Sequence, residues 1–444
     1  MSDRKLAVIV LAAGQGTRMK SDLPKVLHPL AGRPMVQHLM QTVAGLSPDR
    51  VVVVVGPGME AVGKAVAPAS TVLQAERLGT AHAVLQAKDV LAGHDGDILV
   101  LYGDTPCLSL ATLSSLIDRR RKSDNPGVVV LGFEPVDPHR YGRLVVNDTG
   151  LQAIVEWKDA TDQQRQIRLC NSGVMALDGA RAWGWLERID DINAAKEFYL
   201  TDAVKLARQD GAHCAVVLGH EDELQGVNSR AELAVLEAKV QQSLRQKAME
   251  EGATLIAPET VFFSWDTKLG RDVVVWPNVI FGPGVTMGDG VIIKGFCHFE
   301  GCVVEGPADL GPYSRLRPGA KIGPDVHLGN FVEVKNSVVE KGAKINHLTY
   351  VGDATVGAGT NVGAGVITAN YDGFTKSKTI IGEKVSIGSN VVLVAPVTIG
   401  DGAIIGAGSV ITEDVEADSL AVARGRQSQK SGWAALFRKT KTTK

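Results

Sequence analysis

The chain has 444 residues, too many for one ordinary core, so its length favours two or three domains. Hydrophobic residues make up 45% and charged residues 22%, the usual mixture of a globular protein. The formal net charge of −2 argues against a general nucleic-acid-binding surface, so local charges must hold any anionic ligand.

The cysteines and the N-terminus indicate a cytoplasmic protein. The five cysteines show neither CxxC pairing nor metal-ligand spacing: Cys107, Cys170, Cys214, Cys297 and Cys302. We therefore expect reduced, buried thiols. The first apolar run is too short to insert in a membrane and ends in glycine, so we interpret it as a buried strand.

Apolar runs alternate with amphipathic stretches in the first half of the chain. The runs Leu6–Leu11, Val51–Val55, Ile98–Leu101 and Val128–Leu131 are short and rich in β-branched residues, as in strands buried on both faces. The stretches 34–44 and 79–91 have helical periodicity. This alternation predicts an α/β, Rossmann-like layer fold with a mostly parallel sheet over residues 1–227.

A long helix is predicted over residues 228–251. The sequence NSRAELAVLEAKVQQSLRQKAMEE begins with two possible caps, Asn228 and Ser229, and Glu232 stands three positions after Ser229. We interpret this segment as a linker between two domains.

A six-residue repeat fills most of residues 252–444. An aliphatic residue followed by glycine recurs, as in Ile322-Gly, Leu328-Gly, Ile387-Gly and Ile399-Gly, which predicts a parallel β-helix of about nine coils. The repeat is interrupted once at length, over Thr368–Thr379, by a polar and aromatic insertion where a functional loop is expected. The basic tail from Arg424 is interpreted as a solvated end.

A glycine-rich turn with two following cations is the first chemical signal. Gly14 and Gly16 follow the first strand, and Arg18 and Lys25 come shortly after. Backbone N–H groups of such a turn cradle phosphates, and the cations suit a polyphosphate whose leaving group must be neutralised. The GK[ST] ending of a P-loop is absent, and Met19 replaces the third glycine of a dinucleotide fingerprint.

LAAGxGTRM followed by LPK resembles the signature of sugar-phosphate nucleotidyltransferases. The resemblance implies that the sugar nucleotide is bound by Leu11, Ala12, Ala13, Gly14, Lys25, Gln74, Gly79, Thr80, Tyr102, Gly103, Asp104, Gly142, Glu156, Asn171, Tyr199, Thr201 and Asn228. It further implies that Asp104 and Asn228 hold Mg²⁺ and that Lys25 and Arg18 are catalytic. Taken singly, Gly142 could be a turn, Tyr199 a packed aromatic and Asn228 a helix cap.

The β-helix carries residues that a structural coil does not require. Arg317, Lys335 and Tyr350 fall on the same or adjacent coils by the repeat count, and His347 lies close to Tyr350. This arrangement places a candidate base next to cations that could bind a phosphate. A lone histidine on a solenoid is otherwise more often a surface residue.

The stretch RLRPG, NFVEVK, HLTYVGDA, NVGAG and ANYDG resembles the acetyltransferase half of the bifunctional N-acetylglucosamine-1-phosphate uridylyltransferase/glucosamine-1-phosphate acetyltransferases. The resemblance implies that His347 is the general base, oriented or polarised by Glu333. It assigns glucosamine-1-phosphate to Arg317, Lys335, Tyr350, Asn361, Asn370 and Lys376. It assigns acetyl-CoA to Ala364, Tyr371, Ser389, Ala407 and Arg424.

This family resemblance implies a left-handed β-helix, a homotrimer with acetyl sites between neighbouring chains, and small-molecule substrates: UTP, acetyl-CoA and glucosamine-1-phosphate. The product is UDP-N-acetylglucosamine, a precursor of cell-wall and lipopolysaccharide polymers. Two alternatives stay open on sequence alone. The β-helix could serve only for oligomerisation, or the chain could be a non-catalytic scaffold.

Overall fold

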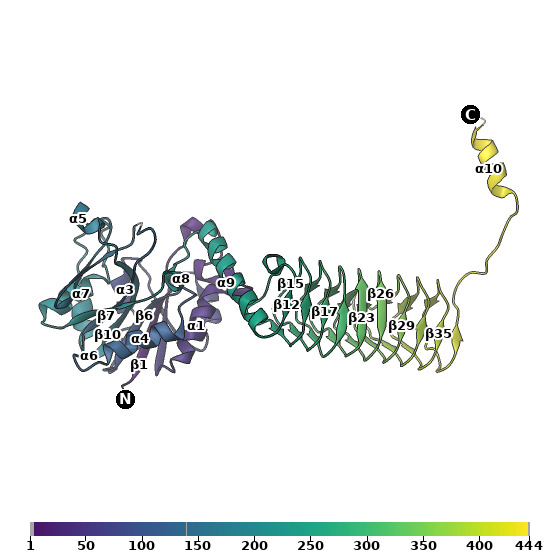
Figure 1. Ribbon diagram of the computed structural model, residues 1–444, viewed down its shortest axis with the longest axis horizontal. Coiled ribbons are helices and arrows are strands. Elements are labelled where there is room, and N and C mark those ends of the chain that lie inside the picture. Colours follow the sequence, from purple (N-terminus) through teal and green to yellow (C-terminus); the bar gives the residue numbers. More distant parts are fainter. Residues whose placement is uncertain (1–3, 139, 443–444) are drawn as a thin grey trace. The chain divides into compact units, whose positions relative to one another are not determined.

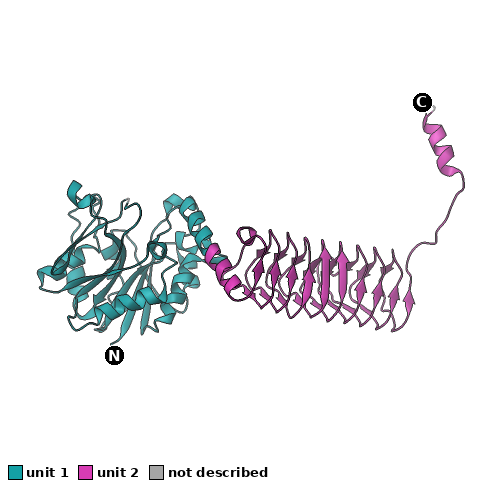
Figure 2. Ribbon diagram, viewed as in Figure 1, with its two compact units in different colours: residues 1–240 teal, residues 241–444 magenta. Residues whose placement is uncertain are grey.

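Figure 1 shows the computed structural model, which describes residues 4–138 and 140–442. The chain divides into two units, Met1–Val240 and Gln241–Lys444, coloured separately in Figure 2. The boundary falls inside helix α9 (Arg230–Glu250).

The described part of the first unit forms a nine-stranded sheet with the order β11-β7-β10-β6-β1-β4-β5, to which β8 and β9 add a hairpin beside β10. Strand β10 runs antiparallel to β6 and β7, whereas the other neighbours on the main path are parallel. The strands are β1 (Leu6–Leu11), β4 (Arg50–Val55), β5 (Ser70–Leu73), β6 (Asp97–Tyr102), β7 (Val128–Phe133), β8 (Arg143–Asn147), β9 (Gly150–Val155), β10 (Cys170–Asp178) and β11 (Cys214–Leu218). A separate small ladder pairs β2 (Pro29–Leu30) with β3 (Arg33–Pro34).

The central strands are buried on both faces, which is why they are continuous apolar runs. Ile9 packs with the cluster on one face of the sheet, and its neighbours Val8 and Val10 pack with the cluster on the other. All four predicted strands are present, as β1, β4, β6 and β7. The Rossmann-like α/β prediction for this half is therefore confirmed.

Helices and helical turns connect these strands: η1 (Thr17–Met19), η2 (Lys25–Leu27), α1 (Met35–Gly45), α2 (Glu60–Ala65), α3 (Thr80–Leu85), α4 (Leu110–Arg120), α5 (Asp162–Arg165), α6 (Gly179–Leu186), α7 (Asp202–Gln209) and α8 (Glu221–Leu224). The predicted helix over 79–91 is shorter than expected. After Leu85 the backbone bonds change from i→i−4 to i→i−3, as in Ala87 N–H to Val84 O, so the segment continues as turns.

Helix α9 begins with a capping arrangement built on Ser229. The Ser229 hydroxyl accepts from Glu232 N–H (3.2 Å), and the Glu232 carboxylate accepts from Asn228 N–H (2.8 Å). Within the second unit, the buried Gln241 amide bonds to both backbone groups of Phe263, so the end of the helix is fixed to the first coil.

Within the described residues after Gln241, three parallel sheets form the faces of the β-helix. The first contains β12 (Thr254–Leu255), β14 (Val274–Val275), β17 (Ile292–Ile293), β20 (Ala308–Leu310), β23 (Val326–Asn330), β26 (Lys344–His347), β29 (Asn361–Val362), β32 (Ser386–Ile387), β35 (Ile404–Ile405) and β37 (Leu420–Ala421). The second contains β13 (Lys268–Leu269), β16 (Thr286–Met287), β19 (Val303–Val304), β22 (Lys321–Ile322), β25 (Val338–Val339), β28 (Ala354–Val356), β31 (Thr379–Ile381) and β34 (Val397–Ile399). The third contains β15 (Ile280–Phe281), β18 (His298–Phe299), β21 (Arg315–Leu316), β24 (Glu333–Lys335), β27 (Tyr350–Gly352), β30 (Ile367–Ala369), β33 (Val392–Val394) and β36 (Val410–Ile411).

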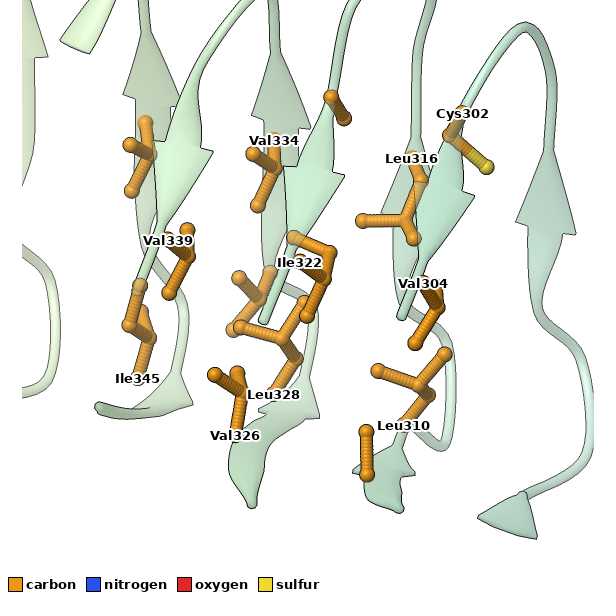
Figure 3. Close-up of a cluster of buried hydrophobic side chains, with 14 of the residues drawn as sticks. Cys302, Val304, Leu310, Leu316, Ile322, Val326, Leu328, Val334, Val339 and Ile345 are labelled. Atoms are coloured by element: carbon orange, nitrogen blue, oxygen red, sulfur yellow. The ribbon is translucent and has the colours of Figure 1, made fainter. Parts of the chain in front are cut away.

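Aliphatic side chains from all three faces fill the interior of the left-handed β-helix. Figure 3 shows Val304, Leu316, Ile322, Val334 and their neighbours pointing inward, and all of these are buried. Each such side chain contributes roughly 1.5–3 kcal/mol by leaving water. The five cysteines, all within the described ranges, are free thiols, and Cys297 and Cys302 fill the interior as expected.

The predicted insertion leaves the solenoid between β30 and β31. Lys344 pairs with Asn361, 17 residues on, whereas Asn361 pairs with Ser386, 25 residues on, so this coil is longer. Asp372 orders the tip by accepting from Phe374 N–H and Thr375 N–H. These bonds, with the Thr375 hydroxyl, lower the pKa of Asp372 to about 2.

The tail ends in the exposed helix α10 (Trp433–Thr442). Across residues 4–138 and 140–442, no helix has the length and apolar character needed to cross a lipid bilayer.

Candidate active sites

The glycine-rich turn follows β1 and brings Lys25 against it. Gly16 adopts a left-handed backbone (φ 61°), and a Cβ there would lie 2.6 Å from Lys25 Cβ. Glycine is therefore required for the close approach of Lys25. Arg77, which sequence reasoning did not identify, fixes the turn from the other side, because its Nε donates to Ala13 O (2.7 Å).

Lys25, Asp104 and Asn228 meet at the carboxyl end of the sheet. Asp104 follows β6, and its carbonyl accepts from Val227 N–H (3.0 Å), which brings in the segment before α9. The Lys25 ammonium forms a short ion pair with the Asp104 carboxylate and donates to Asn228 Oδ1 (3.1 Å). The cap of α9 uses the Ser229 hydroxyl, so the side chain of Asn228 remains directed at this cluster.

The two oxygens of this cluster fit a divalent cation. Asp104 Oδ2 and Asn228 Oδ1 both contact one cation, the Lys25 ammonium, so they face a common point. Carboxylate and amide oxygens suit Mg²⁺, which takes its other ligands from phosphates and water. Within the described residues, no group of three or more His, Cys, Asp or Glu side chains could hold a metal ion.

A cleft of about 260 Å³ adjoins the cluster and contains many of the predicted nucleotide-binding residues. It is lined by Leu11, Ala12, Ala13, Gly14, Lys25, Gln74, Gly79, Thr80, Tyr102 and Asp104, together with Arg77, Glu197, Val26 and Ala83. Arg77 and Glu197 were missed, because each is an isolated charge between the motifs. Burial and the nearby carboxylates raise the pKa of Tyr102, so its hydroxyl stays neutral.

Gly79 and Gln74 are fixed by local contacts in this cleft. A Cβ on Gly79 would lie 2.6 Å from Phe198 N, so only glycine fits beside that backbone. The Gln74 amide donates to Gly79 O (3.1 Å) and also contacts His82 Nδ1 (3.2 Å). Gly103 has more room, since a Cβ there would lie 3.1 Å from Val26 Cγ1, and its N–H donates to Leu11 O (2.9 Å). Arg18 is exposed on η1 and lines neither this cleft nor the next.

The predicted sugar-binding residues Glu156, Tyr199 and Thr201 line a second cavity of about 420 Å³. The Thr201 hydroxyl donates to Glu156 Oε1 (3.4 Å). Burial raises the pKa of Glu156, and burial with nearby carboxylates raises the pKa of Tyr199 to about 12. This cavity offers neutral hydroxyls and the carboxyl groups of Glu156, Asp159, Asp190 and Asp202, which suit the hydroxyls of a sugar.

Gly142 and Asn171 lie beside these residues without lining the cavity. A Cβ on Gly142 would lie 3.4 Å from Glu156 Oε1, so a side chain there would crowd the carboxyl group. Asn171 N–H donates to Gly142 O (2.8 Å), and Asn171 Oδ1 accepts from Gly173 N–H (2.9 Å). Gly173 in turn leaves room for the ring of Tyr102.

In the β-helix, one corner column connects the candidate base to the candidate acetyl-CoA residues. Backbone bonds link Asn330 O to Leu348 N, His347 O to Gly365 N, Ala364 O to Asn390 N, and Ser389 O to Gly408 N. The residues Asn330, His347, Ala364, Ser389 and Ala407 therefore stand at equivalent positions on successive coils. Arg424 continues the column, because its Nη1 donates to Ala407 O (2.7 Å).

Cations gather on the third sheet next to this corner. Arg317 follows β21, Lys335 ends β24, and Tyr350 begins β27, so the predicted grouping on adjacent coils is confirmed. The neighbouring ammonium group of Lys376 lowers the pKa of Lys335, an effect that Arg317 strengthens and Asp353 opposes. Two neighbouring ammonium groups favour an anion between them.

Asn330, which sequence reasoning did not identify, orients His347. The two residues pair in register on β23 and β26, and His347 Nδ1 donates to Asn330 Oδ1 (2.7 Å). This bond fixes the tautomer, so Nε2 carries the free lone pair. Glu333, expected to orient His347, instead pairs with Arg317 (2.8 Å) and Arg315 (3.7 Å), since register places it opposite Arg315.

Asn361 and Tyr371 lie apart from the His347 corner in this chain. Asn361 pairs with Lys344, the opposite end of β26 from His347, roughly 10 Å along the strand. Tyr371 stands in the insertion, where it bridges to Lys376 and its hydroxyl donates to Gly373 O (2.6 Å). Asn370, at the base of the insertion, donates to the buried carboxylate of Asp353.

The family comparisons agree with this pair of sites. Residues 8–168 match the MobA-like NTP transferase domain, and residues 266–301 and 378–413 match the bacterial transferase hexapeptide repeat. The chain is thus a transferase that joins a nucleotidyltransferase unit to a hexapeptide acyltransferase unit.

The similarity to bifunctional relatives extends over the whole chain. The protein named Bifunctional protein GlmU from Paramagnetospirillum magneticum is 66% identical over 444 residues, which cover 100% of this chain and 99% of the relative. Its namesake in Rhodospirillum rubrum is 63% identical over 434 residues (98% and 97%), and that of Sphingopyxis alaskensis is 54% identical over 433 residues (97% and 96%). The chain belongs to the GlmU family of bifunctional proteins.

Family membership decides between the alternatives that the sequence left open. The resemblance proposed from the motifs is confirmed, and the chain is an enzyme with nucleotidyltransferase and acyltransferase activities. A β-helix that serves only for oligomerisation, or a non-catalytic scaffold, does not account for this full-length similarity.

Replacing Asn330 with alanine should lower acyl transfer by about 10- to 100-fold, because the Nδ1–H of His347 loses the acceptor that fixes its tautomer. Steady-state rates of the acyl and nucleotidyl reactions on one preparation measure this. Asn330→Asp is the matched control: it keeps an acceptor, stays active, and moves the acid limb of the rate profile to higher pH because a carboxylate favours imidazolium. A wild-type rate of acyl transfer in Asn330→Ala would contradict the role of Asn330 in orienting His347.

Proposed function

We propose that the enzyme transfers an acetyl group from acetyl-CoA to glucosamine-1-phosphate and then a uridylyl group from UTP to the N-acetylated product, giving UDP-N-acetylglucosamine and pyrophosphate. The observation that carries the proposal is the pair of separate charged sites, one at the sheet edge around Lys25 and one at the β-helix corner around His347. UDP-N-acetylglucosamine would then supply cell-wall and lipopolysaccharide synthesis.

Residues 1–227 are assigned the uridylyl reaction, residues 228–251 the linker, and residues 252–444 the acetyl reaction. The phosphate oxygen of the sugar attacks the α-phosphorus of UTP, a new P–O bond forms, and the bond to the departing pyrophosphate breaks. A general base is unnecessary, since the attacking oxygen is already ionised. The backbone N–H groups after β1, together with Lys25 and the exposed Arg18, stabilise the charge that develops on the phosphates.

The cleft supports the placement of the nucleotide and the sugar. Gln74 and Gly79 hold the uracil end, with Thr80 and Tyr102 close by, and Arg77 fixes the phosphate-binding turn. Glu156, Tyr199 and Thr201 receive the sugar hydroxyls, with Gly142 beside Glu156 and Asn171 bonded to Gly142.

Mg²⁺ is assigned to Asp104 and Asn228. When bound, the ion would supply positive charge that offsets the negative charge developing on the phosphates. The Lys25 ammonium, which contacts both oxygens in this structure, would then be released from Asp104 to serve the phosphates.

Acetyl transfer is assigned to the corner column. The amine nitrogen of the sugar attacks the thioester carbonyl, His347 Nε2 accepts the amine proton, and the C–S bond breaks to release CoA, which takes up that proton as its thiol. Ala364, Ser389 and Ala407 are small, so they leave a groove for the cofactor chain along about 10 Å of the column. Arg424, at its end, suits the nucleotide phosphates, and Tyr371 suits a contact from the insertion.

The sugar phosphate is assigned to the neighbouring cations. Lys335 and Lys376 bind the phosphate with Arg317, which Glu333 holds in place through their ion pair. Tyr350 and Asn370 face the sugar. Glu333 acts through Arg317 in this account, and the orienting role at His347 passes to Asn330.

A homotrimer is proposed because the acetyl site is incomplete in one chain. Asn361 lies about 10 Å from the His347 corner, so it suits the site of a neighbouring chain. Next to the column, Phe296, Tyr313 and Phe331 stack at 5.0 Å centroid spacings while staying about half exposed. Such an exposed aromatic row is typical of an interface. The free cysteines favour a cytoplasmic location.

His347→Ala should lower acetyl transfer by about 10²–10⁴-fold, the range for loss of a general base, while uridylyl transfer from N-acetylglucosamine-1-phosphate stays intact. Lys25→Ala is the reciprocal control and should lower uridylyl transfer by about 10²–10³-fold without affecting acetyl transfer. Both rates are measured on each purified variant. A loss of both activities in either folded variant would contradict two separate sites.

Chelation with EDTA should abolish uridylyl transfer and leave acetyl transfer at its full rate, since only the first site is assigned a metal. Asp104→Asn should have the same selective effect at saturating Mg²⁺. The matched control is Asp162→Asn, an exposed carboxylate of the same unit, which should change neither rate. Uridylyl transfer that persists in EDTA would remove the roles given to Asp104 and Asn228.

A further inference from the structure

A buried carboxylate that neither reaction uses lies at a corner of the β-helix. Asn336, Asp353 and Asn370 stand 17 residues apart on successive coils, where they follow β24, β27 and β30. Asp353 is only 7% exposed and has a left-handed backbone (φ 49°), and Asn336 shares this conformation (φ 45°).

Asp353 is bound from both sides by amide groups. Asn336 Nδ2 donates to Asp353 Oδ1 (2.5 Å), and Asn370 Nδ2 donates to Asp353 Oδ2. An ionised carboxylate can only accept hydrogen bonds, so both amides must turn their NH₂ groups toward it. The carbonyl oxygen of Asn370 is consequently directed away from Asp353.

The charge of Asp353 is maintained by its surroundings. Burial raises the pKa of Asp353, but the hydrogen bonds from Asn336 and Asn370 and the charges of Lys335 and Lys376 outweigh burial, so the pKa is lowered. A buried carboxylate is costly, whereas a third asparagine would complete the same row without charge. The choice of aspartate therefore calls for a role that an amide cannot fill.

We propose that Asp353 is a positioning residue of the acetyl-acceptor site: its carboxylate holds the amide of Asn370 so that the carbonyl oxygen, rather than the NH₂ group, is presented to the bound amino sugar. The site is thereby selective for a sugar that offers a hydrogen-bond donor at that point, an amine or a hydroxyl. This inference rests on the proposed acetylation of glucosamine-1-phosphate.

The competing explanation is a purely structural row of corner side chains. Under that explanation, Asp353 and Asn336 contribute to the same stack, and removing either has the same effect. The two explanations predict different effects of these substitutions on substrate binding, whereas effects on stability do not distinguish them.

The test compares two glycine variants in the full-length enzyme. Asp353→Gly removes the acceptor of Asn370, and Asn336→Gly removes a hydrogen bond from the other side of the same carboxylate. Glycine adopts a left-handed backbone without strain, so the two variants are matched. We expect Asp353→Gly to raise the KM for glucosamine-1-phosphate about tenfold, the effect of one hydrogen bond, and Asn336→Gly to change it less than twofold.

Two further constants measured in the same assay serve as controls, and neither should rise. The KM for acetyl-CoA should not change in Asp353→Gly. The inhibition constant of inorganic phosphate against acetyl transfer should be unchanged or lower, because Lys335 and Lys376 lose a neighbouring negative charge. Equal weakening of phosphate and sugar phosphate would mean that the cation cluster has collapsed, which overturns the inference.

A charge exchange tests the orientation directly. In Asn336→Asp/Asp353→Asn, the new carboxylate accepts the NH₂ of residue 353, whose carbonyl must then face Asn370 and restore its orientation. We expect this double variant to bind glucosamine-1-phosphate more tightly than Asp353→Asn alone and within about threefold of the wild type. This comparison still tests the inference if Asp353→Gly does not fold.

The outcomes distinguish this inference from the proposed function. A wild-type enzyme that does not acetylate glucosamine-1-phosphate contradicts the proposed function itself. An active wild type with equal KM changes in the two glycine variants, or no gain from the charge exchange over Asp353→Asn, overturns the positioning role alone.

Discussion

Backbone pairing between successive coils is the constraint on which the acetyl-transfer half depends. Each strand bonds to the strand one coil away in fixed register, so on most coils residues 17 or 18 positions apart stand above one another, and across the insertion the spacing is 25. The interior aliphatic side chains maintain that register, because a shift by one residue would turn every one of them outward. This pairing alone places the residues from Asn330 to Ala407 in one rigid column along the β-helix.

The nucleotidyltransferase half depends on a different constraint. Parallel strands end at one edge, so the turn after β1 and the aspartate after β6 meet there although almost 90 residues separate them. The segment before α9 joins them through the hydrogen bond from Val227 to Asp104. Each half thus assembles its site around its own core, and the two chemistries are independent in this account.

Much of this arrangement could be predicted from the sequence. Continuous apolar runs that alternate with helical stretches indicated the α/β sheet, and the six-residue repeat indicated the β-helix, because each pattern matches the burial that its fold requires. The motifs located Lys25, Asp104 and His347. The roles of the supporting side chains could not be predicted. Arg77 lies outside the motifs, and Asn330 and Asp353 lie within them without an assigned role, because all three act only through contacts formed by folding. Glu333 shows this limit, because its ion-pair partners depend on strand register, which places it opposite Arg315 and close to Arg317.

The proposed function requires that one chain carries out acetylation first and uridylyl transfer second, at two sites. Product analysis of the wild-type enzyme with glucosamine-1-phosphate, acetyl-CoA, UTP and Mg²⁺, each omitted in turn, tests it most directly. The complete mixture should give UDP-N-acetylglucosamine, and omission of UTP should stop the reaction at N-acetylglucosamine-1-phosphate. Omission of acetyl-CoA should leave glucosamine-1-phosphate largely unconsumed. Formation of a UDP-sugar at an undiminished rate without acetyl-CoA would contradict the claim.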